Sequence, residues 1–340
     1  MTIEVVGSGI ESNEFSSGVQ EIADAVARAV EDFGFRSGEL RLVSHYVNTV
    51  FRLTTDAGRY VVRAHRAANR TASEIASELA WLDSLSLEQD ISVPRVHKTL
   101  DGEAIAIAPV TDEETELPIS ILGWVSGRTI GDEKHPRDFR ELGRMIASLH
   151  RHAQIWSPSA SFDRPTYDSK SIFRLDFQVR MAKILGFNDA RPIIEALSTL
   201  RQRLESVESE LGSTSDVFGL VHGDLSFGNV LFGNSGAIPI DFDDCGFGYY
   251  LHDFSVPLAG GWVKPGFDER YQAFVTGYRQ RHELPRDLLQ HVPVFLGLRS
   301  AQLIMDYLGQ VPWKQGIFDQ YRTRLLPALE ACDVSSDWIR

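Results

Sequence analysis

Acidic and amide side chains gather in one otherwise apolar stretch, Leu220 to Gly248, which reads LVHGDLSFGNVLFGNSGAIPIDFDDCGFG. Two short strands, NVLFG and AIPID, flank the turn NSG, and antiparallel pairing puts Asn229 opposite Ile240 and beside Asp241. Asp224 enters the same end of this hairpin from the preceding loop. Because unpaired buried carboxylates cost several kcal/mol per ion, the sequence predicts a cation among these oxygens.

The types of ligand indicate which cation to expect. Asn and Asp oxygens suit Mg²⁺, which typically takes one or two carboxylates together with substrate phosphates. Zinc prefers His and Cys ligands, and although His222 and Cys245 are present, no second His stands at ligand spacing nearby. The stretch therefore indicates a magnesium site that handles phosphate.

Length and composition narrow the class of protein. The chain has 340 residues, 43% hydrophobic and 24% charged, which is typical of a globular protein with room for two lobes. A formal charge of −13 argues against general binding to nucleic acid or anionic membranes and would favour cationic ligands, although it also serves solubility. No run approaches the roughly 20 apolar residues of a membrane span. Two distant cysteines and an N-terminus without a signal-peptide pattern lead us to expect a cytoplasmic protein.

The elements that must position these residues follow from the hydrophobic pattern. Residues 18–33 carry apolar side chains at helical spacing and stop at Gly34. Three antiparallel strands with a turn at residues 56–58 follow, and then a helix at residues 71–87. Further strands bring the sheet to about five, and beyond residue 126 the pattern becomes largely helical, interrupted by the stretch described above.

The motif Asp224, four residues, Asn229, a hairpin and Asp241 has the spacing of kinase catalytic and metal-binding residues. HGDLSFGN followed by IDFDDCGFG resembles the aminoglycoside phosphotransferase and choline kinase family, which is related to protein kinases but has Gly where those have the Arg of His-Arg-Asp. YVVRAHR, SELAWLDSL, ILGWVSGRTI, LGRMIASLHRH and LHDFS also occur in the family's order, so the similarity covers most of the chain.

The resemblance implies a bilobal, protein-kinase-like α+β fold. A small N-terminal lobe, residues 1–126, with about five antiparallel strands would clamp the nucleotide. A larger, mainly helical lobe, residues 127–340, would carry catalysis and bind the substrate. The division falls near Ser126 to Asp132.

Roles in the large lobe follow from position in the resembling motif. Asp224 would accept or orient the proton of a substrate hydroxyl, and Asn229 and Asp241 would hold Mg²⁺ on the nucleotide phosphates. Asp243 matches the second acid of the family's Asp-x-Asp variant and is expected at the metal or at a water, with a helix cap or an Arg partner as the alternative. Asp253 would brace the catalytic loop, and a bracing role is also expected for His222.

The small lobe is expected to supply the nucleotide clamp. Arg63 in YVVRAHR stands where kinases have Lys, and an Arg at that place still binds phosphate. Glu78 shares a helix face with apolar residues, so we expect it, rather than Glu74, to pair with Arg63. The hinge GWVSG would present backbone groups near Trp124 and Val125 to adenine.

The resemblance predicts an ATP-dependent phosphotransferase, with GTP as an alternative nucleotide, that acts on a hydroxyl of an amino alcohol, an amino acid or an aminoglycoside-like molecule. Arg299 and Asp306 lie seven residues apart on one helix face. They are expected to bind a zwitterionic acceptor or to form an ion pair with each other. DFDD is similar to the metal motif of bacterial stress-response Ser/Thr protein kinases, which makes a protein kinase the main alternative.

Two further alternatives receive less support. A catalytically silent nucleotide-binding module is disfavoured because Asp224, Asn229 and Asp241 are all present, and a metal-dependent phosphohydrolase would need more His and Asp ligands. Gly7-x-Gly9 opens like a dinucleotide-binding fingerprint, but Ser12 stands where the third Gly belongs. The sequence does not indicate an oligomeric state.

Overall fold

The structure, a computed structural model, describes residues 3–6, 17–66, 70–110, 116–131, 134–173, 176–234, 236–283, 287–309 and 314–333. The Gly7-x-Gly9 segment and Asp132, at one end of the expected division, lie outside the described residues. By its internal contacts the chain forms two compact units. The first comprises residues 1–126 and 158–164, and the second comprises residues 127–157 and 165–340.

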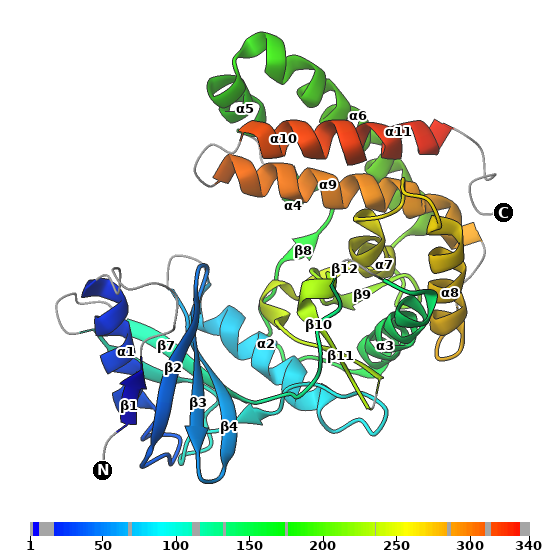
Figure 1. Cartoon of the computed structure of the whole chain (residues 1–340). Helices are drawn as coiled ribbons and strands as arrows, with labels where there is room; N and C mark the ends of the chain where they lie inside the picture. Colours follow the sequence, from blue (N-terminus) through cyan, green and yellow to red (C-terminus); the bar gives the residue numbers. More distant parts are fainter. Residues whose placement is uncertain are drawn as a thin grey trace. The chain divides into compact units, whose positions relative to one another are not determined.

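A mainly antiparallel sheet of seven strands forms the first unit (Figure 1). Its strands follow the order β1-β2-β3-β4-β7-β5, and β6 also pairs with β7. The strands are β1 (Ile3–Val6), β2 (Gly38–His45), β3 (Thr49–Thr55), β4 (Gly58–Ala64), β5 (Val96–His97), β6 (Ala106–Pro109) and β7 (Glu116–Gly123).

The three strands expected from the alternating pattern are β2, β3 and β4, and Thr55 pairs with Gly58 across the predicted turn. The count of about five leaves out β1 and β5. β5 has two residues and is too short to show a period. β1 also departs from the antiparallel expectation because it pairs parallel to β2.

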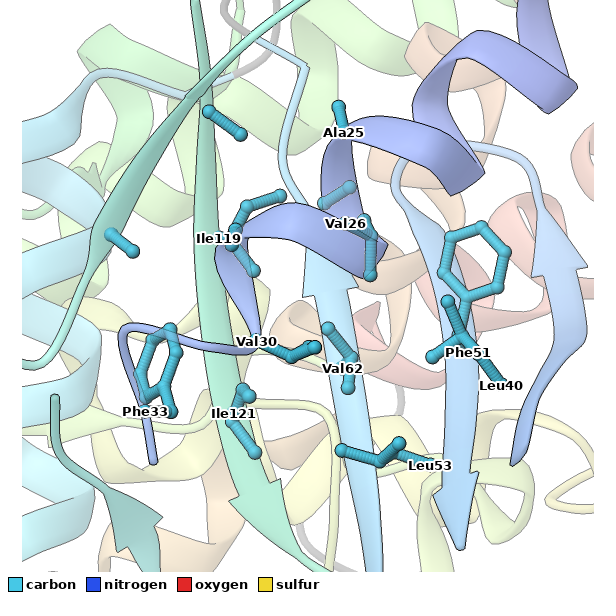
Figure 2. Packing of buried hydrophobic residues seen from close by; sticks show 14 of the residues in the cluster. Ala25, Val26, Val30, Phe33, Leu40, Phe51, Leu53, Val62, Ile119 and Ile121 are labelled. Carbon is cyan, nitrogen blue, oxygen red and sulfur yellow. The ribbon is translucent and has the colours of Figure 1, made fainter. Parts of the chain in front are cut away.

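Helix α1 (Ser17–Ala29) covers one face of this sheet. Figure 2 shows Val26 and Val30 facing Phe51, Val62 and Ile119 from the strands, and all five are fully buried. The helix ends four residues earlier than predicted because the chain tightens into i to i+3 turns over residues 30–34. The glycine stop is confirmed, since Gly34 adopts φ +86°.

Helix α2 (Ala72–Leu85) begins with a capping box, in which Thr71 and Glu74 satisfy each other's backbone N–H groups. This local bond explains why Glu74 is held at the first turn of the helix. Glu78 lies one turn further on and is completely buried beside Ile75 and Leu82. The sequence rule that an acid in an apolar stripe needs a cation therefore applies to Glu78.

The second unit is mainly helical. Its α-helices are α3 (Pro136–Ile155), α4 (Ser169–Ile172), α5 (Phe177–Leu185), α6 (Phe187–Leu211), α7 (Tyr250–Ala259), α8 (Phe267–Arg279), α9 (Val292–Gly309), α10 (Lys314–Gln320) and α11 (Leu326–Asp333). Between the last two, residues Tyr321–Leu325 form a π-helical turn. Helix α9 runs alongside α10 and α11 (Figure 1).

Helices α3 and α8 pack with their backbones in close contact. A Cβ atom at Gly143 would lie 2.2 Å from the carbonyl oxygen of Phe274, and one at Gly277 would lie 2.0 Å from that of Arg140. Glycine is thus required at both positions. The contact fixes α3, which carries His150 toward the residues described below.

Two small sheets complete the second unit. Strands β10 (Val230–Gly233) and β11 (Gly236–Pro239) form the expected hairpin, and β12 (Gly246–Tyr249) lies between β8 (Thr166–Tyr167) and β9 (Phe218–Val221). Short 3₁₀ turns, η1 (Phe227–Asn229) and η2 (Phe242–Asp244), connect them, and η3 (Asp287–His291) precedes α9. No helix in the described part of the chain is long and apolar enough to cross a membrane. The predicted bilobal α+β fold is confirmed.

Candidate active site

The β10–β11 hairpin has the register that the sequence predicts. Gly233 pairs with Gly236, and at the open end the Ile240 N–H donates to the carbonyl oxygen of Asn229 over 2.9 Å. Asn229 and Asp241 therefore meet at one end of the hairpin. Asp241 has φ +63° and is the sole described non-glycine residue with positive φ. Such backbone strain gathers at functional sites.

The Asp224 carboxylate is held on both oxygens. Asn229 Nδ2 donates to Oδ2 over 2.9 Å and also to the main-chain oxygen of Asp224 over 2.9 Å. Arg299 Nη2 from α9 donates to Oδ1 over 2.5 Å. The Asp224 side chain is 25% exposed, so it is oriented by protein groups and remains accessible to a ligand.

Asp253 on α7 fixes the loop before Asp224. Its carboxylate accepts from the N–H groups of His222, over 2.8 Å, and Gly223, over 2.9 Å. His150 Nε2 from α3 donates to it over 3.3 Å, and the Tyr278 hydroxyl donates to His150 Nδ1 over 2.8 Å. Burial by itself raises the pKa of Asp253, but the His150 hydrogen bond and the neighbouring imidazoles outweigh it and hold the pKa below its ordinary value. Asp253 is therefore a charged, fully buried brace.

His222 is also bound to the main chain through both ring nitrogens. Nε2 donates to the carbonyl oxygen of Ile240 over 3.1 Å, and Nδ1 accepts from the Asp224 N–H over 3.4 Å. The ring is completely buried. This arrangement links the loop to the hairpin and suits the expected bracing role better than proton transfer.

The residues proposed for metal binding fit a hard cation. Asn229 donates twice through its Nδ2, and its Oδ1 faces no described donor. Asp241 is exposed. Asp243 follows on η2 and is half-buried. Among the described residues no group of three or more His, Cys, Asp and Glu side chains gathers closely enough to hold a metal alone. Two or three oxygen ligands suit Mg²⁺, which fills its remaining positions with water and phosphate.

Arg299 and Asp306 both lie on α9, but the structure shows no ion pair between them. Arg299 turns to Asp224 instead. The desolvation that accompanies burial, together with the Asp244 and Asp224 charges, raises the pKa of Asp306 to about 6, and Arg299 opposes this shift. Asp306 keeps access to solvent. The alternative in which the two residues pair with each other is therefore wrong, whereas their role toward a substrate stays a prediction.

In the first unit, Arg63 and Glu78 form the expected ion pair. Arg63 Nη2 on β4 lies 2.7 Å from Glu78 Oε1 on α2, and the side chains are 5% and 0% exposed. Glu74 instead caps α2 and lies 3.8 Å from Arg70. The predicted choice of Glu78 over Glu74 is correct, and the binding of phosphate by Arg63 stays a prediction.

The segment expected to meet adenine continues directly from β7. The Trp124 N–H donates to the Arg59 carbonyl oxygen over 3.0 Å, and the Arg59 guanidinium lies over the indole ring at 5.5 Å. Among the described residues none accepts from the Val125 N–H or donates to the Trp124 carbonyl oxygen. Contact between these two backbone groups and adenine stays a prediction.

Sequence reasoning missed several groups in the second unit. His150 and Tyr278 support Asp253 from two other helices, and no local pattern marks either as a partner of LHDFS. A cavity of about 590 Å³ includes Ser226 and Phe227, which follow the proposed catalytic loop, and Arg299, which the sequence analysis expects at the substrate. The other residues of its wall could not be read from the sequence, because they come from segments spread over almost two hundred residues.

Comparisons with known proteins agree on one family. The model of the phosphotransferase enzyme family matches residues 39–289. Amicoumacin kinase of Bacillus subtilis (strain 168) is 26% identical over 303 residues, which cover 86% of this chain and 85% of that protein. An uncharacterized protein of Deinococcus radiodurans is 24% identical over 79% of this chain and 77% of its own length.

Solved structures show the same relationship. The microcompartment-associated aminopropanol kinase superposes with a TM-score of 0.73 at 28% identity, covering 94% of this chain and 99% of that one. Amicoumacin kinase hAmiN, solved with AMP-PNP, Ca²⁺ and Ami, gives a TM-score of 0.71 at 20% identity and 94% coverage of both chains, which shows the shared fold.

Proposed function

The chain belongs to the phosphotransferase enzyme family, and from that premise we propose that it moves the γ-phosphoryl group of ATP to a hydroxyl group of a small molecule. The observation that carries the proposal is the Asp224 carboxylate, oriented by Asn229 at the hairpin end that also bears Asp241. Relatives that share this fold include kinases named for small molecules, amicoumacin and aminopropanol.

Asp224 is the proposed general base. Its carboxylate would accept or orient the proton of the acceptor hydroxyl, which is worth roughly 10²- to 10⁴-fold in rate. The hydrogen bonds from Asn229 and Arg299 fix its two oxygens, so the carboxylate keeps its orientation while the acceptor binds. Asp253 and His222 would maintain that orientation, because they hold the backbone N–H groups of residues 222–224.

Asn229 and Asp241, with Asp243 as a third candidate, would hold Mg²⁺ against the nucleotide phosphates. A bound Mg²⁺ would neutralise charge that develops on the phosphates during transfer. In the first unit, Arg63 would contact phosphate while Glu78 keeps the guanidinium in place. Backbone groups of Trp124 and Val125 would meet the base, with ATP as the proposed nucleotide and GTP as the alternative.

A thermal-shift titration with ATP and GTP, each with and without Mg²⁺, tests the nucleotide site. A ligand at about a hundred times its Kd stabilises the folded state by about 2.7 kcal/mol, so a metal-dependent rise in Tm is expected. No shift with either nucleotide would contradict the proposal.

Turnover tests the role of Asp224. Asp224→Asn should abolish acceptor-dependent ADP release while keeping the nucleotide-induced shift, and the exposed Asp189→Asn on α6 serves as the matched control. Equal turnover by Asp224→Asn and the wild type would refute the assignment. Phosphorylation of a generic protein, with no small molecule present, would instead favour the protein-kinase alternative.

A further inference from the structure

The cavity of about 590 Å³ lies within the second unit and adjoins the proposed catalytic loop. Ser226 and Phe227 form part of its wall and follow Asp224 by two and three residues. The wall also contains apolar side chains, among them Phe139 and Val256. Five cationic side chains complete it: Lys134, Lys264, Arg270, Arg299 and Arg324.

The charge of this cavity has one sign. Among the described residues that line it there is no Asp, Glu or His. Arg299 is paired with Asp224, and the other four cations form no ion pair with any carboxylate in the described part of the chain. Lys134 donates to the Gly131 carbonyl oxygen over 3.0 Å and lies 5.2 Å from the Phe227 ring centre. Arg270 donates to the carbonyl oxygen of Pro265 over 3.1 Å.

Cations that share a cavity repel one another, and burial strengthens the repulsion because little water screens it. Arg324 shows this effect: burial, followed by the nearby Arg299 charge, lowers its pKa. Within the described part of the chain, its side chain donates one hydrogen bond, to Gln320 Oε1 over 3.2 Å. An anion among these side chains would offset the repulsion and supply acceptors for their N–H groups.

We propose that this cavity binds an acidic group of the acceptor, a carboxylate or a phosphate, so that the substrate is a hydroxyl-bearing acid. The inference rests on the proposed function, since it names the acceptor of that reaction. The volume is that of a small-molecule pocket, and the apolar wall would take the carbon skeleton. A substrate of this kind differs from the amine named for the solved aminopropanol kinase.

The acceptor's charge can be tested with matched compounds. Hydroxy acids with three to six carbons are each compared with the primary amide and the amine of the same skeleton, and ADP release from ATP and Mg²⁺ is measured. We expect kcat/KM for the acid to exceed that for its amide by about 10- to 100-fold, the effect of one or two charge-assisted hydrogen bonds. Equal or better turnover of the amides or amines would overturn the proposal.

Variants test whether the cations of the cavity carry this preference. Lys264→Gln with Arg270→Gln should raise KM for the preferred acid at least about tenfold with a smaller change in kcat, because uniform binding is lost. The matched control is Arg191→Gln with Arg201→Gln, two cations with solvent-accessible side chains on α6 that lie outside the cavity. A KM that shifts equally in both double variants would refute a role for the cavity.

A binding measurement separates this inference from the proposed function. With the nucleotide site saturated by AMP-PNP and Mg²⁺, inorganic phosphate should raise Tm in a saturable way, and the Lys264→Gln, Arg270→Gln variant should lose that rise. Absence of the phosphate effect overturns the inference even if the nucleotide binds as proposed. Absence of nucleotide binding would overturn the proposed function, while phosphate still tests the cavity.

Discussion

Gly223→Ala offers the sharpest test of how the proposed catalytic loop is built. Gly223 stands between His222 and Asp224, has φ +85°, and donates its N–H to Asp253. A Cβ atom at this position would lie 2.3 Å from the carbonyl oxygen of Asp244. The loop therefore needs glycine for two separate reasons, the sign of φ and the close approach of η2.

The losses of stability and of kcat/KM in Gly223→Ala can be estimated from these two requirements. A side chain in the left-handed region costs roughly 1–2 kcal/mol of stability. Because ordinary contacts begin near 3.4 Å, Cβ and the Asp244 oxygen must separate by about 1.1 Å. A displacement of about 1 Å in a reacting group lowers the rate about 10²-fold, which corresponds to about 2.7 kcal/mol in the activation free energy. We expect kcat/KM to fall by about that factor in Gly223→Ala.

The matched control is Gly186→Ala, between α5 and α6. Gly186 has φ +87°, but its Cβ would meet no described atom within 4 Å, so the variant has the conformational cost without the contact. Thermal unfolding should show losses of stability in both variants, and ADP release with the best acceptor should fall strongly in Gly223→Ala alone. Rates within about threefold of each other would refute the argument.

Three further predictions test other parts of the chain. Arg63→Ala removes the guanidinium from the buried Glu78 and leaves that carboxylate without its cation. Urea unfolding should show a loss of stability of about 3–5 kcal/mol. A loss below about 1 kcal/mol would contradict the role of the pair. Because the pKa of Asp306 is raised to about 6, the folded state binds this proton more readily than the unfolded chain, so wild-type stability should fall relative to Asp306→Asn as pH rises from about 4 to about 6. A difference in Tm between these two proteins that stays flat over that range would contradict the shift. Asp241→Ala should lose the Mg²⁺-dependent part of the ATP-induced rise in Tm, which Asp189→Ala should keep, and an unchanged rise would exclude Asp241 as a ligand.

The features predicted correctly from the sequence depend on short-range rules. The register of the β10–β11 hairpin follows from one turn and a period of two, and it brings Asn229 to Asp241 without further information. The pairing of Glu78 with Arg63 follows from an acid within an apolar helix face. In both cases a local pattern leaves one arrangement that satisfies the polar groups.

Contacts between distant segments could not be predicted in this way. Arg299 reaches Asp224 across 75 positions, and His150 reaches Asp253 across 103. Neither Arg299 nor His150 sits in a pattern that names its partner, because either could pair with many acids in the chain. The close contact between Gly223 and Asp244 likewise appears only after η2 has folded against the loop. Such contacts depend on the packing of whole helices.

The net charge and the cavity favour ligands of opposite sign. A charge of −13 suggested cationic ligands, yet the space beside Asp224 is lined by five cations. At physiological ionic strength surface charges more than about 8 Å away are largely screened, whereas charges that line a partly enclosed cavity are screened less. The five cations come from five segments, the residues before α3, the α7–α8 connection, α8, α9 and the π-helical turn. The composition does not reveal that these five residues converge. If the acceptor binds here as proposed, they would set the sign of the field that it meets, and the preference for an acid over an amine would depend on them rather than on the charge of the chain.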